Sequence, residues 1–129
     1  MRLWHEQLLS YLPRQQLLGQ HRECCALRGN GWNKPHATVN YVFEYAPYQL
    51  FQYHEMVLEE MSRRGYNHDN LWDDPYYRGK NCPKHSDESL FQGNNFSKNS
   101  SSIYQEHDEA YLRICIENLK DKGINIALS

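Results

Sequence analysis

Residues 46–65 read APYQLFQYHEMVLEEMSRRG and show the clearest helical pattern in the chain. Pro47 favours the first turn of a helix, and Gly65 favours its end. Between them, side chains that we expect to face the core recur at the three- and four-residue spacing of a helix: Leu50, His54, Val57, Leu58 and Met61. The polar side offers two acid–base pairs four residues apart, Glu59–Arg63 and Glu60–Arg64. The pattern predicts an amphipathic helix with its stripe in the core and both ion pairs exposed.

Two further segments are predicted to be helices. Pro13 opens residues 14–27, which end at Gly29–Gly31, and the core-facing side is predicted to carry Leu17, Leu18, His21, Cys24 and Cys25. The opposite arc then carries Gln15, Gln16, Gly19, Gln20, Arg22, Glu23 and Ala26. Residues 104–122 form the last predicted helix, which Gly123 stops and which directs inward Leu112, Cys115, Ile116 and Leu119. Residues 32–45 are compatible with a short strand or a short helix, and we favour the helix.

Residues 67–102 differ in composition from these segments, being rich in Asn, Asp, Ser and Lys. Such a composition is typical of surface loops, here with scattered apolar anchors at Trp72, Tyr76, Tyr77, Leu90, Phe91 and Phe96. We expect residues 99–102 to be mobile. The chain as a whole is therefore predicted to be an all-α protein: one compact domain over residues 1–129, with about three main helices and long polar loops.

The chain of 129 residues is long enough to fold around one core without metal or disulfide staples. Its start lacks the apolar run of a signal peptide, and no stretch approaches the length that crosses a bilayer, so we expect a cytoplasmic protein without membrane contact. Two of the four cysteines, Cys24 and Cys25, are adjacent, which favours reduced thiols over a disulfide framework. A monomer is the expected state.

The net charge of −2 is unlike that of a protein that coats nucleic acid through a general excess of Lys and Arg. The distribution is more informative. Residues 1–40 hold five basic and two acidic side chains, a net +3, whereas the rest of the chain holds nine basic and fourteen acidic ones, a net −5. A polyanion is therefore expected to approach the N-terminal third, whose basic residues are Arg2, Arg14, Arg22, Arg28 and Lys34.

The chemistry is suggested by the start MRL and by residues 12–23, which read LPRQQLLGQHRE. Here the sequence resembles the pyrimidine-dimer DNA glycosylase family. That family begins with a Thr-Arg pair after loss of its initiator Met, and a Gln-(His)-Leu run leads along one helix to an Arg-Glu pair. The resemblance continues through residues 37–43 (ATVNYVF) and 63–67 (RRGYN) and covers about half of the chain.

The resemblance implies a DNA repair glycosylase with AP lyase activity on double-stranded DNA that carries a damaged or abasic nucleotide. The N-terminal amine of Met1 would attack the sugar, and Glu23 would be the essential carboxylate. Met1 is expected to be retained because Arg2 is too large a second residue for its removal. The resemblance further implies DNA contacts by Arg2, Gln15, Gln16 and Arg22, and no cofactor.

The sequence departs from the family pattern at three positions and in its C-terminal tail. The family's second basic residue, three past the Glu, falls on Ala26, although Arg28 is expected to reach the same region of the DNA. Gln16 replaces a His, and Met1 replaces a Thr whose hydroxyl is lost. The family's aromatic and lysine-rich C-terminal tail has no counterpart in residues 114–129.

Two alternative functions fit the sequence. The first is a non-catalytic nucleic-acid-binding relative that keeps the helical scaffold. The second is a zinc-stabilised interaction module, because His21–Cys24 and Cys82–His85 are ligand pairs at a spacing seen in zinc sites. The same four residues also fit as ordinary core and loop residues, so no metal is assigned.

Overall fold

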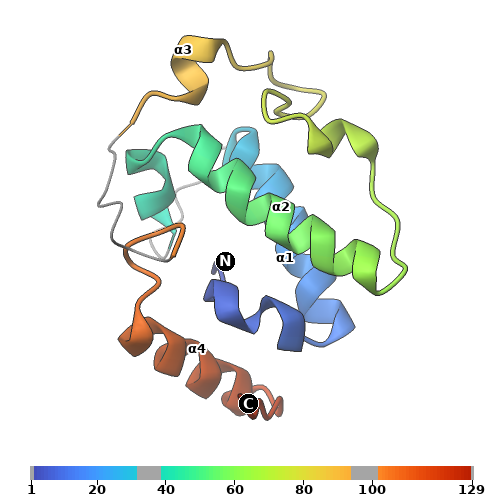
Figure 1. Ribbon diagram of the computed structural model, residues 1–129, viewed down its shortest axis with the longest axis vertical. Helices are drawn as coiled ribbons and strands as arrows, with labels where there is room; N and C mark the ends of the chain where they lie inside the picture. The colour runs from blue at the N-terminus through green and yellow to red at the C-terminus, as the bar shows by residue number, and fades with distance from the viewer. Residues whose placement is uncertain (1, 32–38, 94–101, 129) are drawn as a thin grey trace.

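The computed structural model describes residues 2–31, 39–93 and 102–128, and within these ranges it contains helices and no strand (Figure 1). The longer helices are α1 (Arg14–Arg28), α2 (Pro47–Arg63) and α4 (Glu109–Asp121). Shorter helical segments are η1 (Glu6–Tyr11), η3 (Asn40–Glu44), η4 (Asn70–Asp73) and α3 (Asp87–Leu90). The all-α prediction is confirmed. None of the helices in the described part of the chain is long and apolar enough to span a bilayer.

Helix α2 lies across α1 at the centre of the molecule, and η1 packs beside both (Figure 1). The predicted limits of α2 are confirmed, since Pro47 occupies its first turn and Gly65, with a φ of 82°, follows its end. Its whole predicted stripe is buried: Leu50, His54, Val57, Leu58 and Met61. The apolar members of this stripe, without His54, form with Leu17 and Cys24 of α1 the core that fixes the two helices against each other.

The polar side of α2 differs from the prediction. Glu60 is buried rather than exposed, and both Arg63 and Arg64 pair with it, so the expected Glu59–Arg63 pair is replaced. Arg64 also donates to the Leu12 carbonyl at 2.7 Å. The end of η1 lies close enough to cover Glu60, and the two guanidinium groups supply the hydrogen bonds that a buried carboxylate requires.

Helix α1 has the predicted limits, but one residue of its predicted outer arc lies inside. Gln20 is 1% exposed, because the N-terminal segment of the chain covers it. The predicted inward side chains are otherwise placed as expected: Leu17 and Cys24 are buried, and Leu18, His21 and Cys25 are half-buried. Helix α1 is therefore covered on two sides, by α2 and by residues 2–5.

The last helix begins later than predicted. Asp108 caps α4 by accepting a hydrogen bond from the Tyr111 amide, so residues 104–108 form a turn before it. Tyr104 and His107 in that turn are buried. The predicted inward residues are confirmed, with Cys115 and Leu119 fully buried and Leu112 and Ile116 packed against the core.

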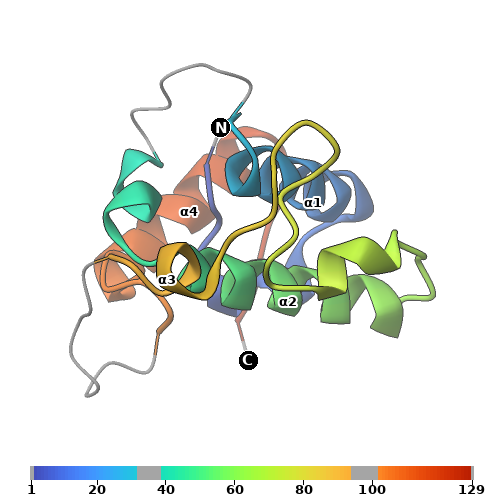
Figure 2. The same cartoon turned by 90° about the horizontal axis from the view of Figure 1, so that it is seen from above.

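The helical interpretation of residues 32–45 is confirmed for η3, while residues 32–38 lie outside the described part of the chain. The segment after α2 returns along α1 and α2 and carries η4 and α3 (Figure 2). The Trp72 and Tyr77 rings pack 4.7 Å apart, and Leu90 is buried, as expected of anchors. Phe91 is 55% exposed, but its ring packs against that of Tyr48 on α2 with 5.1 Å between the centroids, so it anchors its segment at the surface rather than in the core. Phe96 and residues 99–101 lie outside the described residues.

Candidate active site on helix α1

The side-chain amide of Gln20 joins the N-terminal segment to helix α1. Its Oε1 accepts from the Trp4 amide at 2.7 Å and faces the Tyr53 hydroxyl at 2.8 Å. Its Nε2 donates to the Arg2 carbonyl at 2.9 Å and to Glu23 Oε2 at 3.2 Å. Both protons of the amide and at least one lone pair of its oxygen are therefore used.

These partners fix the orientation of the Gln20 amide. A flipped amide would turn its two protons towards the Trp4 N–H and its oxygen towards the Glu23 carboxylate, placing donor against donor and acceptor against acceptor. Because Gln20 is also almost fully buried, any other arrangement leaves polar groups unpaired inside the protein. The residue thus acts as a rigid connection between Arg2 and Glu23.

Two tyrosines bind backbone carbonyls of the same segment. The Tyr53 hydroxyl of α2 donates to the Trp4 carbonyl at 2.5 Å, and the Tyr111 hydroxyl of α4 donates to the Leu3 carbonyl at 2.6 Å. Burial raises the pKa of both phenols well above the usual range, so both remain neutral donors. Residues 2–4 are consequently tied to α1, α2 and α4 at once.

Glu23 is half-buried on α1, three residues after Gln20, and the described contacts place its carboxylate beside the Arg2 backbone. Glu23 also has a partner besides Gln20. Met1, the other expected catalytic residue, lies outside the described part of the chain. The chain start and the Arg22-Glu23 pair are the two elements expected to carry the chemistry. In the described residues, Gln20 connects them by bonding to both Arg2 and Glu23.

The outer face of α1 leads along the helix to Glu23. Gln15 and Arg22 are exposed and Gln16 is half-buried. At Gly19 an added Cβ would meet Arg22 Nη2 at 3.7 Å, an ordinary van der Waals distance. The protein's own packing therefore does not demand glycine there, and Gly19 leaves an open strip of backbone on this face.

Arg2 is half-buried at the edge of the same region. Its guanidinium carbon lies 6.0 Å from the centre of the Trp4 ring and 5.8 Å from the centre of the Tyr111 ring. A cation held between two ring faces keeps its hydrogen-bond donors at the edge of the guanidinium plane. Arg2 also donates to the side chains of Tyr111 and Cys115, so contacts with α4 help to position its guanidinium.

The structure corrects the expected role of Arg28. This residue is 5% exposed, and its guanidinium donates to the carbonyls of Trp72, Asp74 and Tyr77 at 2.9, 2.6 and 3.0 Å. It also lies over the Trp72 ring, 5.0 Å from its centre. Arg28 thus anchors the loop after α2 to helix α1, and its donors do not face solvent where a phosphate would bind.

A groove runs beside Ala26, the position at which the expected second basic residue is absent. Its volume is 420 Å³, and its walls include Arg22, Arg78 and Lys80 but no acidic residue. Arg78 donates to the carbonyls of Arg28 and Gly29, both at 3.1 Å, which places the loop that also carries Lys80 against the end of α1. Sequence patterns did not indicate this groove, because Arg22 is separated by more than fifty residues from Arg78 and Lys80.

The zinc ligand pairs considered from the sequence are not assembled in the described residues. The Cys24 side chain is fully buried in the core, and His85 hydrogen bonds to Ser89 instead. Cys82 lines the groove described above. His21 contacts the next cysteine, Cys25, and not Cys24.

Comparison with known families gives one match. A family model described as pyrimidine dimer DNA glycosylase matches residues 1–74, which include the N-terminal segment, η1, α1, η3 and α2. Searches of curated proteins and of solved structures found no match. The matched region contains Arg2, Gln20 and Glu23, the residues that the hydrogen bonds described above bring together.

Proposed function

Because the chain belongs to the pyrimidine dimer DNA glycosylase family, whose members are DNA repair glycosylases, we propose that it removes damaged pyrimidines through its N-terminal amine and Glu23 and then cleaves the strand as an AP lyase. One observation carries this proposal. The buried Gln20 amide donates to the Arg2 carbonyl and to the Glu23 carboxylate, so the start of the chain and the carboxylate share one rigid support.

The first step is attack of the neutral Met1 amine on C1′ of the damaged nucleotide. The N–C1′ bond forms, the glycosidic bond breaks, and the base leaves with its bonding electron pair and takes up a proton. Loss of the amine's protons and opening of the sugar ring then give an imine. A terminal α-amine suits this step, because its reference pKa of about 7.7–8.0 leaves part of it unprotonated at neutral pH.

Glu23 serves both halves of the reaction. Its carboxylate stabilises the positive charge that develops on the sugar as the base departs. Afterwards it accepts a proton from C2′ of the imine, and the electron pair left behind expels the 3′ phosphate by β-elimination. The hydrogen bond from Gln20 keeps one Glu23 oxygen oriented during both steps.

We place the bound DNA on the outer face of α1. Arg22 and Arg2 neutralise phosphates on either side of the extruded nucleotide, and Gln15 and Gln16 hydrogen bond to base edges. Arg78 and Lys80 extend the basic surface along the groove beside Ala26. Gly19 leaves room for close approach of the DNA backbone.

The test is glycosylase activity on a duplex oligonucleotide that carries a single cyclobutane pyrimidine dimer, with a duplex carrying an abasic site as the lyase substrate. Glu23→Gln keeps the shape and removes the charge, so we expect turnover to fall by at least about 100-fold on both substrates, with DNA affinity nearly unchanged. Glu59→Gln, an exposed carboxylate on α2, is the matched control and should retain full activity.

Two results would count against the proposal. Equal activity of Glu23→Gln and the wild type would remove the carboxylate from the mechanism. Tight binding of damaged duplex by a wild-type protein that turns over neither substrate would favour the non-catalytic relative.

A further inference from the structure

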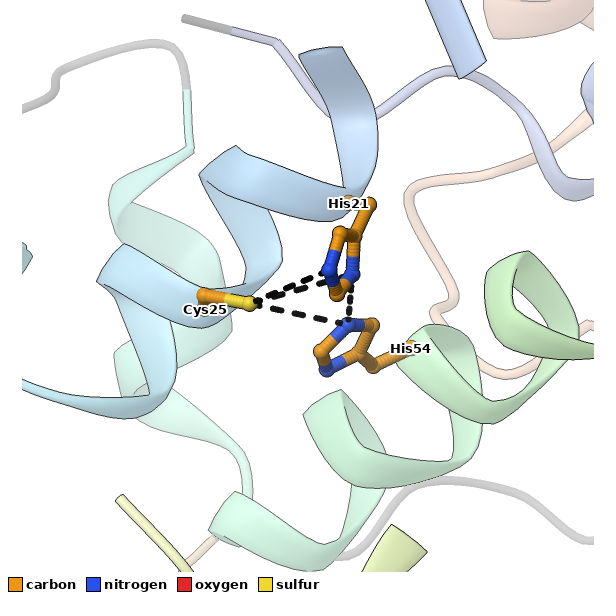
Figure 3. A group of neighbouring side chains, drawn as sticks. All are labelled: His21, Cys25 and His54. Carbon is orange, nitrogen blue, oxygen red and sulfur yellow. Dashed lines mark hydrogen bonds between the residues drawn. The ribbon is translucent and has the colours of Figure 1, made fainter. Parts of the chain in front are cut away.

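Three side chains with metal-binding atoms meet between α1 and α2 (Figure 3). His21 and Cys25 lie one turn apart on α1, and His54 faces them from α2. His21 Nδ1 is 2.9 Å from His54 Nε2, and Cys25 Sγ lies 3.8 Å from His21 Nδ1 and 4.0 Å from His54 Nε2. In the described part of the chain, this is the one such group of three or more.

The dimensions of this triangle fit a tetrahedral zinc ion. With Zn–N bonds of about 2.0–2.1 Å and Zn–S bonds of about 2.3 Å, tetrahedral ligands stand about 3.3 Å apart for two nitrogens and about 3.6 Å apart for nitrogen and sulfur. The nitrogens of His21 and His54 therefore need to separate by a few tenths of an ångström, and the sulfur needs to approach by a similar amount. Rotations of the three side chains supply such shifts.

We propose that His21, Cys25 and His54 form a Zn²⁺ site that links α1 to α2. Two imidazoles and a thiolate are the ligand types that Zn²⁺ takes and that Mg²⁺ and Ca²⁺ do not. The fourth position is taken by solvent, because Cys25 also lines the groove beside Ala26, through which water and the ion reach the site.

The metal-free protein satisfies the same atoms by hydrogen bonds. Arg28 Nη1 lies 3.1 Å from His54 Nδ1 and donates to it, so the His54 proton resides on Nε2 and is donated to His21 Nδ1. Zinc binding at Nε2 moves that proton to Nδ1 and ends the Arg28–His54 contact, while Arg28 keeps its three carbonyl acceptors. One proton is released, from the Cys25 thiol.

Two consequences follow from this exchange. The fold does not require the ion, unlike that of a zinc finger, because hydrogen bonds already pair His21 Nδ1 and both ring nitrogens of His54 in its absence. The loaded site instead stiffens the turn of α1 between His21 and Cys25, which contains Glu23. The inference does not depend on the glycosylase proposal, since metal binding can be measured without DNA.

The test is titration of the full, tag-free chain with Co²⁺, which reports tetrahedral geometry by its visible bands and a thiolate ligand by charge-transfer absorption in the near ultraviolet. We expect one equivalent to bind with both signals and Zn²⁺ to displace it. Cys25→Ala should lose the charge-transfer band and bind at least about 100-fold more weakly. Cys24→Ala, the adjacent cysteine whose sulfur is buried in the core, is the matched control and should bind normally.

His21→Gln provides a second variant that retains the thiol, in case Cys25→Ala does not fold. It should keep a charge-transfer band but lose the intensity of the tetrahedral bands and at least about 100-fold in affinity. Absence of cobalt binding by the wild type would leave a hydrogen-bonded cluster only. A charge-transfer band that survives in Cys25→Ala, or disappears in Cys24→Ala alone, would overturn the assignment.

Discussion

Replacing Gln20 with leucine tests whether this buried amide holds the start of the chain against Glu23. Leucine has a similar volume, so the packing is preserved while the hydrogen bonds are lost. Leaving the buried Trp4 N–H without its acceptor should lower the free energy of unfolding by about 1–3 kcal/mol. The weaker hydrogen bonds lost at Arg2 and Glu23 bring the total loss to about 2–4 kcal/mol. At about 3–5 °C per kcal/mol for a domain of this size, Tm should fall by roughly 10 °C.

Urea unfolding followed by circular dichroism measures the change. The midpoint should shift with an unchanged slope, because leucine alters stability and not the surface exposed on unfolding. Gln15→Leu, on the exposed face of the same helix, is the control and should stay within about 0.5 kcal/mol of the wild type. Equal stability of the two variants would refute the structural role of Gln20, and undiminished activity of a folded Gln20→Leu protein would refute its link to catalysis.

Three other perturbations give distinct outcomes. Gly19→Ala should stabilise α1 by up to about 1 kcal/mol, since no protein atom opposes the added methyl group, yet weaken DNA binding; equal gains in stability and affinity would exclude close approach of the DNA backbone. Arg22→Ala should reduce the salt dependence of DNA binding by about one phosphate contact, whereas Arg63→Ala on α2 should leave the dependence unchanged; the reverse pattern would move the interface. Burial lowers the pKa of His107 to about 3, below its unfolded value of about 6.5. The free energy of unfolding should therefore be unaffected by this group above about pH 6.5 and should decline by about 1.4 kcal/mol per pH unit as the pH falls towards 3. Urea titrations at several pH values should show a shallower decline in His107→Gln, and an unchanged decline would assign the acid sensitivity to other groups.

Periodicity along the chain was sufficient to predict α1 and α2, because each buries one continuous stripe against the same core. It failed where a distant segment covers a polar side chain. By its spacing, Gln20 belongs to the outer arc of α1. It is buried because the N-terminal segment of the chain lies over it. Glu60 was predicted to be exposed for the same reason, since η1 covers it from far away in the sequence.

In the candidate site, too, local patterns were predictive and contacts with distant segments were not. Glu23 and Arg22 were predicted because they stand in a local motif on one helix. Arg28 carries an equally local signal, a basic residue close to that motif, yet its guanidinium is occupied by carbonyls of a loop more than forty residues away. The pairing of His21 with Cys25 and His54 likewise depends on how α2 crosses α1, which spacing within one helix does not specify.

The central claim is that the amine at the start of the chain forms a covalent imine with damaged DNA. Borohydride reduction of a mixture of the tag-free protein with duplex carrying an abasic site or a cyclobutane dimer fixes such an imine, and mass spectrometry of the digested adduct locates it. We expect the DNA to be attached to the Met1 nitrogen and an added N-terminal tag to abolish trapping. An adduct mapped to a lysine, or equal trapping by the tagged protein, would contradict it.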